Sequence, residues 1–155
     1  MYTAVQNNIF AAVEQFPEDK YTWQPTPEVR SWARLIGHLT DDNNGACWSL
    51  AGLTERPAVV DAPNGVESAA NKKAKADLVA GLRASIDLCG KAFAAVSPAT
   101  MNEPLGNRSK IGALIYNTSH TNEHYGNLVT YMRLQNMVPP SSQPRGGGPG
   151  RGRGN

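Results

Sequence analysis

The spacing of apolar residues along the chain predicts four helices. In the first segment the apolar positions recur at steps of four and three, the period of one helix face. They are Val5, Ile9, Val13 and Phe16. Pro17 follows directly and is expected to end this helix, because proline lacks an amide hydrogen and clashes with the preceding turn.

A second helix is predicted from Thr26–Pro27, where threonine can cap the first turn and proline fits the first helical position. Its apolar stripe consists of Trp32, Leu35, Ile36, Leu39, Ala46 and Leu50. The segment from Gly52 to Gly65 contains Pro57 and Pro63 and has few periodic positions. We therefore expect a long loop after this helix.

The third and fourth helices are predicted to begin near Lys75 and after Ser109, which can serve as an N-cap. The third is expected to end at Ser97–Pro98, and residues 98–108 form a second long connection. The fourth ends before Pro139–Pro140. The apolar stripe of the third helix is Leu78, Leu82, Ile86, Cys89, Phe93 and Val96, and that of the fourth is Ile111, Leu114, Leu128, Val129 and Met132.

These elements predict an all-α fold. No segment shows the sustained alternation of apolar and polar residues that is typical of a strand, so no sheet is predicted. Four helices with long connections suit a four-helix bundle. We predict one domain over residues 1–142, because a chain of 155 residues suits a single core. Residues 143–155 are rich in arginine and glycine and have no apolar residue to bury, which predicts a disordered tail.

Charge and hydropathy exclude several classes of protein. The formal net charge of +2 is too small for a general polyanion binder, and the basic excess lies in the tail. Flexible Arg/Gly segments can bind single-stranded nucleic acid, but this tail has three arginines and no aromatic residue, so nucleic acid is not the expected partner. No apolar run reaches the ~20 residues needed to cross a bilayer. The start, Met1–Val5, does not resemble a signal peptide. The chain as written is expected in the cytoplasm, and an exported form stays open if the N-terminus is trimmed.

The three histidines of the chain indicate a metal site. His120 and His124 are four residues apart in a predicted helix, so both imidazoles lie on one face, about a turn apart. His38 lies beside the core stripe of the second helix. Neutral imidazole is a good ligand for zinc, nickel, copper or iron, and three histidines leave one position open, as in catalytic zinc sites. We predict one divalent metal held by His38, His120 and His124.

The polar neighbours of the histidine pair leave two interpretations of the fourth helix. Asn117, Asn127 and Tyr131 continue the stripe of the two histidines at steps of three and four. If this stripe faces the interior, its polar groups must be paired or bind something, because buried unpaired polar groups are costly. In the alternative it faces solvent, and the core face consists of Leu114, Tyr125, Leu128 and Met132.

Two carboxylates lie close to the histidines in sequence. Asp42 follows His38 by four residues and shares its face. It could be a fourth ligand, an acceptor that orients an imidazole, or a general base, and an exposed aspartate is the alternative. We assign Asp42 the catalytic role of the base. Glu123 is not placed as in an H-E-x-x-H motif and is expected at the surface.

The two cysteines, Cys47 and Cys89, are not at the spacing of a redox or zinc motif. Cys89 lies on a core stripe and Cys47 lies next to another, so a disulfide between the second and third helices is one interpretation. Two separate buried thiols are the preferred interpretation, because free cysteine is commonly buried. A bridge would indicate an oxidising compartment.

Three stretches of the chain resemble the DinB family of helical bundles. They are Pro27–Ser31 leading to Leu35–Leu39, then His120–Gly126, then Val138–Ser142. The resemblance covers nearly the whole chain except the tail. It implies an up-up-down-down four-helix bundle with one metal, usually zinc or nickel. His38 matches the first ligand of the family, and His120 and His124 match the other two.

The resemblance also implies a chemistry. The superfamily includes metal-dependent transferases that use low-molecular-weight thiols such as bacillithiol or mycothiol, and a maleylpyruvate isomerase. Many members are dimers, so a homodimer is compatible with it. We therefore expect a metal-dependent transferase of the thiol S-transferase type, or a hydrolase, that acts on a small molecule. The alternative is a non-catalytic module that binds a metal or a small ligand.

Overall fold

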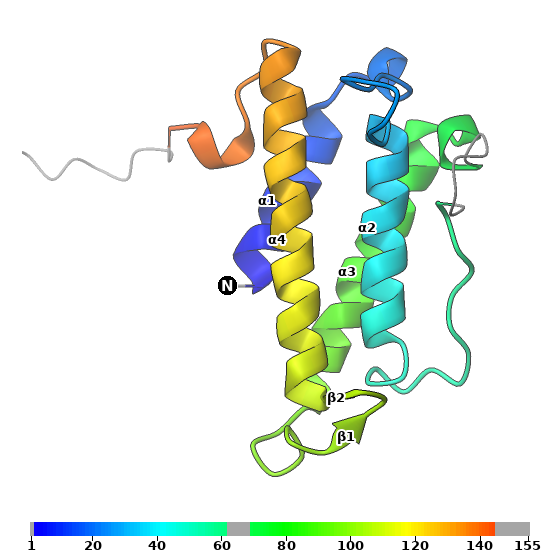
Figure 1. Ribbon diagram of the computed structural model, residues 1–155, viewed down its shortest axis with the longest axis vertical. Coiled ribbons are helices and arrows are strands. Elements are labelled where there is room, and N and C mark those ends of the chain that lie inside the picture. Colours follow the sequence, from blue (N-terminus) through cyan, green and yellow to red (C-terminus); the bar gives the residue numbers. More distant parts are fainter. Residues whose placement is uncertain (1, 62–68, 145–155) are drawn as a thin grey trace, which may run out of the picture.

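The computed structural model describes residues 2–61 and 69–144, and within these ranges it is built on four long helices (Figure 1). The helices are α1 (Tyr2–Gln15), α2 (Trp32–Cys47), α3 (Lys75–Ala95) and α4 (Lys110–Leu134). Short 3-10 helices and a small hairpin lie between and after them: η1 (Glu18–Lys20), η2 (Ala69–Lys72), β1 (Pro104–Leu105), β2 (Arg108–Ser109) and η3 (Pro140–Ser142). The predicted all-α four-helix bundle is confirmed.

The helices follow an up-down-down-up order (Figure 1). α2 and α3 run parallel, because Asn43 bonds to Ser85 and, one turn further along both helices, Cys47 bonds to Cys89. α3 begins at the end of the bundle at which α2 began (Figure 1). The up-up-down-down order implied by the resemblance is therefore corrected: the parallel pairs are α2 with α3 and α1 with α4.

Capping side chains set where the two site-bearing helices begin. Ser109 Oγ accepts a hydrogen bond from the Gly112 amide at 3.1 Å, so the predicted cap of α4 is confirmed. Ser31 Oγ accepts from the Arg34 amide at 3.2 Å, and α2 begins directly after it. The predicted start of this helix at Thr26–Pro27 is wrong, because that segment forms turns.

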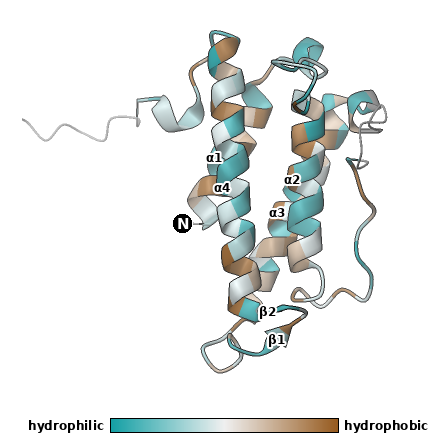
Figure 2. Ribbon diagram, in the orientation of Figure 1, coloured by the Kyte–Doolittle hydropathy of each residue, from teal (hydrophilic) through white to brown (hydrophobic). Residues whose placement is uncertain are grey.

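The core lies between the four helices, and each helix carries both hydrophobic and hydrophilic segments (Figure 2). The indole of Trp32 is fully buried and stacks on the ring of Phe16, with ring centroids 3.7 Å apart. Burial of apolar side chains of this size stabilises the fold by roughly 1.5–3 kcal/mol each. The buried aliphatic side chains that surround this pair include Ile9, Leu35, Ile36, Leu39, Leu78, Leu82, Leu128 and Met132.

A small sheet at one end of the bundle corrects the prediction that the chain contains none. β1 and β2 are two-residue strands that pair antiparallel. Gly106 takes the first position of the connecting turn with φ of +58°, a conformation that favours glycine. Strands of two residues are too short to show alternation. The dipeptide Gly106–Asn107 is the signal that could have revealed the hairpin.

The C-terminal prediction falls largely outside the described residues. The structure describes the predicted tail only at Gln143 and Pro144, and residues 145–155 lie beyond it. The side chain of Gln143 donates a hydrogen bond to Gln15 Oε1 at the end of α1, at 2.9 Å. The domain boundary at residue 142 and the disorder of the tail stay predictions. Among the described helices, none has the length and apolar character that a membrane span requires.

Candidate metal centre

The three histidines converge between α2 and α4. Nε2 of His124 lies 3.0 Å from Nε2 of His38 and 3.0 Å from Nε2 of His120. One ring nitrogen from each histidine lies within 4.8 Å of the other two. Nitrogens that share one tetrahedral zinc at about 2.05 Å are about 3.3 Å apart, so these donors fit a single ion after small movements.

The residue before His38 explains how this part of α2 is held. A Cβ built on Gly37 would lie 3.1 Å from Cβ of Ala70 and 3.2 Å from Cβ of Asp61. Glycine therefore allows the connection after α2 to pack closely against the helix, one residue from the first histidine. This close packing explains why a glycine precedes His38.

Burial favours the neutral form of the imidazoles. It lowers the pKa of His38 from 6.5 to about 4, with the Arg30 charge as the next cause. Burial also lowers the pKa of His124 from 6.5 to about 4, helped by the neighbouring His120. Neutral imidazole is the form that coordinates metals, so no proton has to leave these two groups near neutral pH.

Asp42 lies against the outer nitrogen of one histidine. Its Oδ2 contacts Nδ1 of His120, while Nε2 of His120 points into the cluster. A carboxylate in this position orients a metal-binding imidazole and fixes which nitrogen carries the proton. Of the roles left open for Asp42, the contact matches the orienting acceptor. Glu123 is exposed, as predicted.

Both faces that were weighed for α4 are buried in part. Asn117 is buried and its Nδ2 donates to Asn43 Oδ1 at 3.2 Å, and the hydroxyl of Tyr131 donates to the Arg30 carbonyl at 2.9 Å. Asn127, by contrast, is exposed. The inward interpretation therefore holds for the part of the stripe that contains the histidines. The apolar face is buried as well, at Leu114, Tyr125, Leu128 and Met132.

The sequence did not reveal a cavity of about 400 Å³ that adjoins the cluster. Asp42 and Asn117 form part of its wall, together with Arg56 and Arg108. Arg56 lies in the irregular segment after α2, and Arg108 lies in β2. Helical periodicity carries no information about either position, so neither arginine stood out as a site residue.

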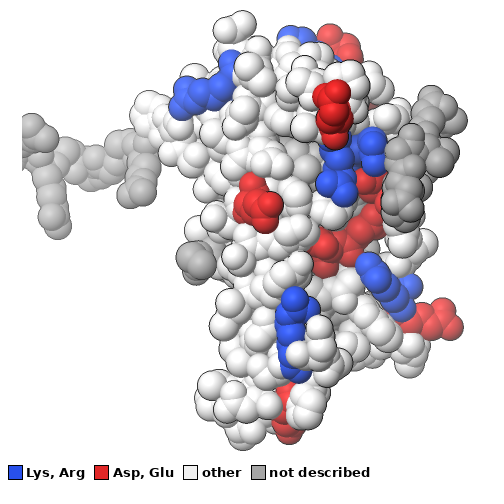
Figure 3. Space-filling model, in the orientation of Figure 1, with Lys and Arg blue, Asp and Glu red and all other residues white. Residues whose placement is uncertain are grey.

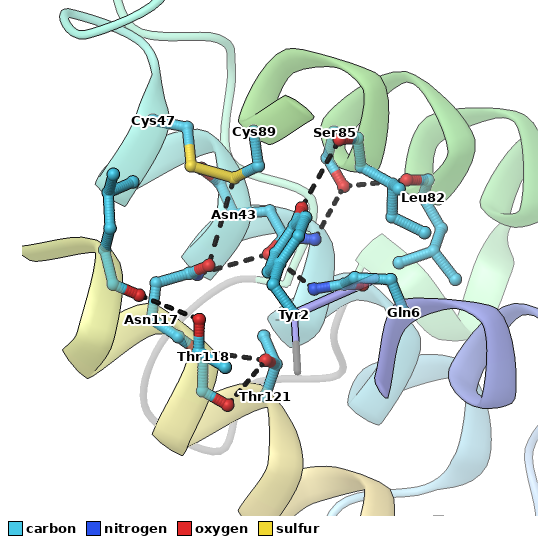
Figure 4. Close-up of a disulfide and its surroundings, with 12 residues drawn as sticks. Tyr2, Gln6, Asn43, Cys47, Leu82, Ser85, Cys89, Asn117, Thr118 and Thr121 are labelled. Carbon is cyan, nitrogen blue, oxygen red and sulfur yellow. Dashed lines mark hydrogen bonds between the residues drawn. A yellow bond between two sulfur atoms is a disulfide. The ribbon is translucent and has the colours of Figure 1, made fainter. Parts of the chain in front are cut away.

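A disulfide joins Cys47 and Cys89 next to this region (Figure 4). The parallel arrangement of α2 and α3 brings the two Cα atoms to 5.0 Å, within the usual span of about 4.4–6.8 Å for a disulfide. The preferred interpretation of two separate buried thiols is therefore wrong. Sequence periodicity could not decide the question, because it does not show which buried positions of two helices lie opposite each other.

The fold and the site together define a class of protein, a four-helix bundle with a cluster of three histidines between two of its helices. The family model of the DinB superfamily matches residues 1–128, a range that includes all three histidines. The chain belongs to the DinB superfamily. No match was found among the curated proteins.

Proposed function

We propose that this protein binds one divalent metal ion through His38, His120 and His124 and catalyses a metal-dependent group transfer. The leading reaction is transfer of a small thiol to an electrophile. The observation that carries the proposal is the convergence of three Nε2 atoms, two of them on imidazoles held neutral by burial. Zinc and nickel suit this donor set.

Three neutral ligands leave the full charge of the ion in place, so a bound metal would lower the pKa of a thiol at its open position. Asp42 acts as a positioning residue in this proposal, because its carboxylate contacts His120 Nδ1 and keeps Nε2 directed at the cluster. A further role for Asp42 as the base can be distinguished from positioning, because loss of a base would change how the reaction rate depends on pH.

The test combines metal reconstitution with a simple thiol reaction. Metal-free protein is loaded with zinc, nickel or manganese and supplied with 2-mercaptoethanol and 1-chloro-2,4-dinitrobenzene. A sulfur–carbon bond forms, the carbon–chlorine bond breaks, chloride leaves and the thiol proton passes to the buffer. We expect turnover that requires the metal and that is lost in His124→Ala.

Arg133→Gln is the matched control, because this exposed residue of the same helix should leave both metal content and rate unchanged. Metal binding without any rate above the uncatalysed background would favour the non-catalytic binding module. Turnover that persists in His124→Ala would contradict the histidine site itself.

A further inference from the structure

A cavity of about 400 Å³ lies beside the histidine cluster, at the end of the bundle that carries the hairpin. Its wall is formed by the end of α2 and the segment after it, the hairpin of β1 and β2, and the start of α4. Tyr116 belongs to this wall and also stacks on His120, with ring centroids 5.8 Å apart. A small molecule in this cavity would therefore lie next to the proposed metal centre.

Two arginines line the cavity, and neither pairs with a carboxylate of residues 2–61 or 69–144. Arg56 Nη2 donates to the backbone carbonyl of Asp41 at 3.3 Å. The guanidinium of Arg108 lies 4.1 Å from the centre of the Tyr116 ring, and its Nη1 donates to Asn107 Oδ1 at 3.5 Å. Both guanidinium groups keep further N–H donors, because each has five.

The carboxylate of Asp41, whose backbone carbonyl accepts from Arg56, is bonded to backbone amides. Asp41 Oδ1 and Oδ2 accept hydrogen bonds from the backbone amides of Val60 and Asp61, both at 2.7 Å. The Asp42 carboxylate in the cavity wall contacts His120. The wall of the first cavity therefore carries two positive charges, on Arg56 and Arg108, and one negative charge, on Asp42. The Asp42 carboxylate is directed at the imidazole of His120.

A glycine in α2, Gly45, leaves room for the side chain of Arg56. A Cβ at position 45 would lie 2.7 Å from Nη2 and 3.1 Å from Cζ of Arg56. Gly45 therefore lets the guanidinium approach the backbone of α2 in the wall of the cavity. Glycine is unfavourable inside a helix, and this close approach is the use that the structure makes of it.

A second cavity, on the other side of the cluster, also has two arginines and one carboxylate in its wall, but these arginines are paired. Arg30 and Arg34 line it, but both pair with Asp61, at 3.2 and 3.1 Å. Glu28 adds a negative charge to the same wall. In Figure 3 acidic side chains occupy the middle of the face between α4 and α2, with basic side chains above and below them. Of the two cavities, the first is the one whose arginines have no carboxylate partner among the described residues.

We propose that the first cavity binds the carboxylate of a small acidic substrate, with Arg56 and Arg108 as its partners. Guanidinium groups match the planar, two-oxygen shape of a carboxylate. A net wall charge of one suits a monoanion better than a doubly charged phosphate. The proposal rests on the proposed function of the histidine cluster, because the thiol or electrophilic end of the substrate then lies toward the metal centre.

Two thiols of similar size, one ending in a carboxylate and the other in a neutral hydroxyl group, test this proposal. 3-Mercaptopropionate and 3-mercapto-1-propanol are titrated calorimetrically into the zinc-loaded protein. We expect the carboxylate probe to bind about tenfold more tightly, as a charge-assisted pair in a solvent-accessible cavity predicts. Arg56→Gln and Arg108→Gln should each reduce this preference, while the matched control Arg133→Gln on exposed α4 surface should keep it.

A second readout separates this proposal from that of the metal centre. Trp48 lies in the cavity wall, so its indole N–H signal in NMR spectra should shift on addition of 3-mercaptopropionate, with or without zinc. The shift should disappear in the double variant Arg56→Gln/Arg108→Gln. If zinc does not bind, the proposed function fails while the Trp48 shift still tests the cavity.

The proposal is overturned if both probes bind the wild-type protein equally, or if the preference and the Trp48 shift survive in the double variant. If the glutamine variants unfold, Arg56→Lys and Arg108→Lys replace them in the test, because lysine keeps the positive charge but lacks the planar guanidinium group. A reduced preference in these folded lysine variants supports the proposal, and an unchanged preference contradicts it.

Discussion

Among single residues, the contact between Asp42 and His120 matters most for the site. The Asp42 carboxylate lies at Nδ1 of His120, so it orients the ring with Nε2 directed toward His124. Spacing placed Asp42 on the face of His38. It could not show which side chain of the facing helix Asp42 would meet, because that depends on how α2 and α4 pack.

Asp42→Asn is expected to weaken zinc binding about 10–100-fold, as loss of a carboxylate behind a ligand histidine does in other metal sites. Competition with a chelator of known affinity measures the change. Asp87→Asn on the exposed surface of α3 is the control and should bind zinc like the wild type. Equal zinc affinity of Asp42→Asn and wild type would contradict the positioning role.

The two buried histidines also make the stability of the metal-free protein depend on pH. Their pKa values are lowered from 6.5 to about 4 on folding, so between these values the unfolded chain takes up protons that the folded chain does not. The free energy of unfolding should therefore fall as the pH is lowered from 6.5 toward 4. Denaturant titrations at pH 7.5 and 5 measure this.

His38→Gln should show a smaller loss of stability between the same two pH values, because one of the two titrating groups is gone. A wild-type free energy of unfolding that stays constant from pH 7.5 to 5 would argue against buried neutral imidazoles in the folded protein.

At the scale of the helices, one side chain of α2 bonds to each of the other three (Figure 4). Asn43 Oδ1 accepts from Gln6 Nε2 of α1 at 3.5 Å and from Asn117 Nδ2 of α4 at 3.2 Å. Asn43 Nδ2 donates to Ser85 Oγ of α3 at 3.2 Å. This buried polar network ties the four helices together beside the histidine cluster.

Asn43→Ala should lower the free energy of unfolding by about 2–4 kcal/mol, because it leaves buried polar groups of three helices without their partner. Urea titration measures the loss. Asn7→Ala, at an exposed position of α1, should change the stability by no more than about 0.5 kcal/mol. A similar small effect for both variants would show that the network does not hold the helices.

Helix bounds could be predicted where one local signal dominates. Pro17 after α1 and Ser109 before α4 are such signals, and both predictions are confirmed. The start of α2 was missed because Thr26 followed by Pro27 also satisfies the local rules for a helix start, as Ser31 does. Tertiary contacts decide: the first amides of α2 donate to carbonyls of the preceding loop, from Trp32 to Trp23 and from Ala33 to Tyr21.

On the scale of the whole molecule, the disulfide links two parallel helices and encloses the connection that carries Arg56. Cys47 and Cys89 are 42 residues apart, and closing a loop of this size stabilises the fold by about 4 kcal/mol in the chain-entropy model. The double variant Cys47→Ala/Cys89→Ala should lose stability of that order in urea titration.

Thiol counting under denaturing, non-reducing conditions checks the bridge directly, and we expect no reactive thiol. Two free thiols per chain would contradict it. The same count on freshly isolated protein tests the expected cytoplasmic location, because stable disulfides are typical of oxidising compartments.

The overall arrangement of the bundle was the part least accessible from the sequence. Four helical patterns predict a bundle, but the direction of α3 depends on where the long connection after α2 returns the chain. The grouping of the three histidines could be predicted because all lie in helices with clear periodicity. The arginine-lined cavity could not, because it needs the end of α2, the hairpin and the start of α4 together. The homodimer stays a prediction.

The metal content of the purified protein tests the central claim most directly. Elemental analysis of the wild type, after loading with zinc or nickel and removal of excess metal, should give about one ion per chain. His120→Ala should lose it, because one of the three converging nitrogens is gone. Full metal content in His120→Ala, or no metal retained by the wild type, would contradict the three-histidine centre.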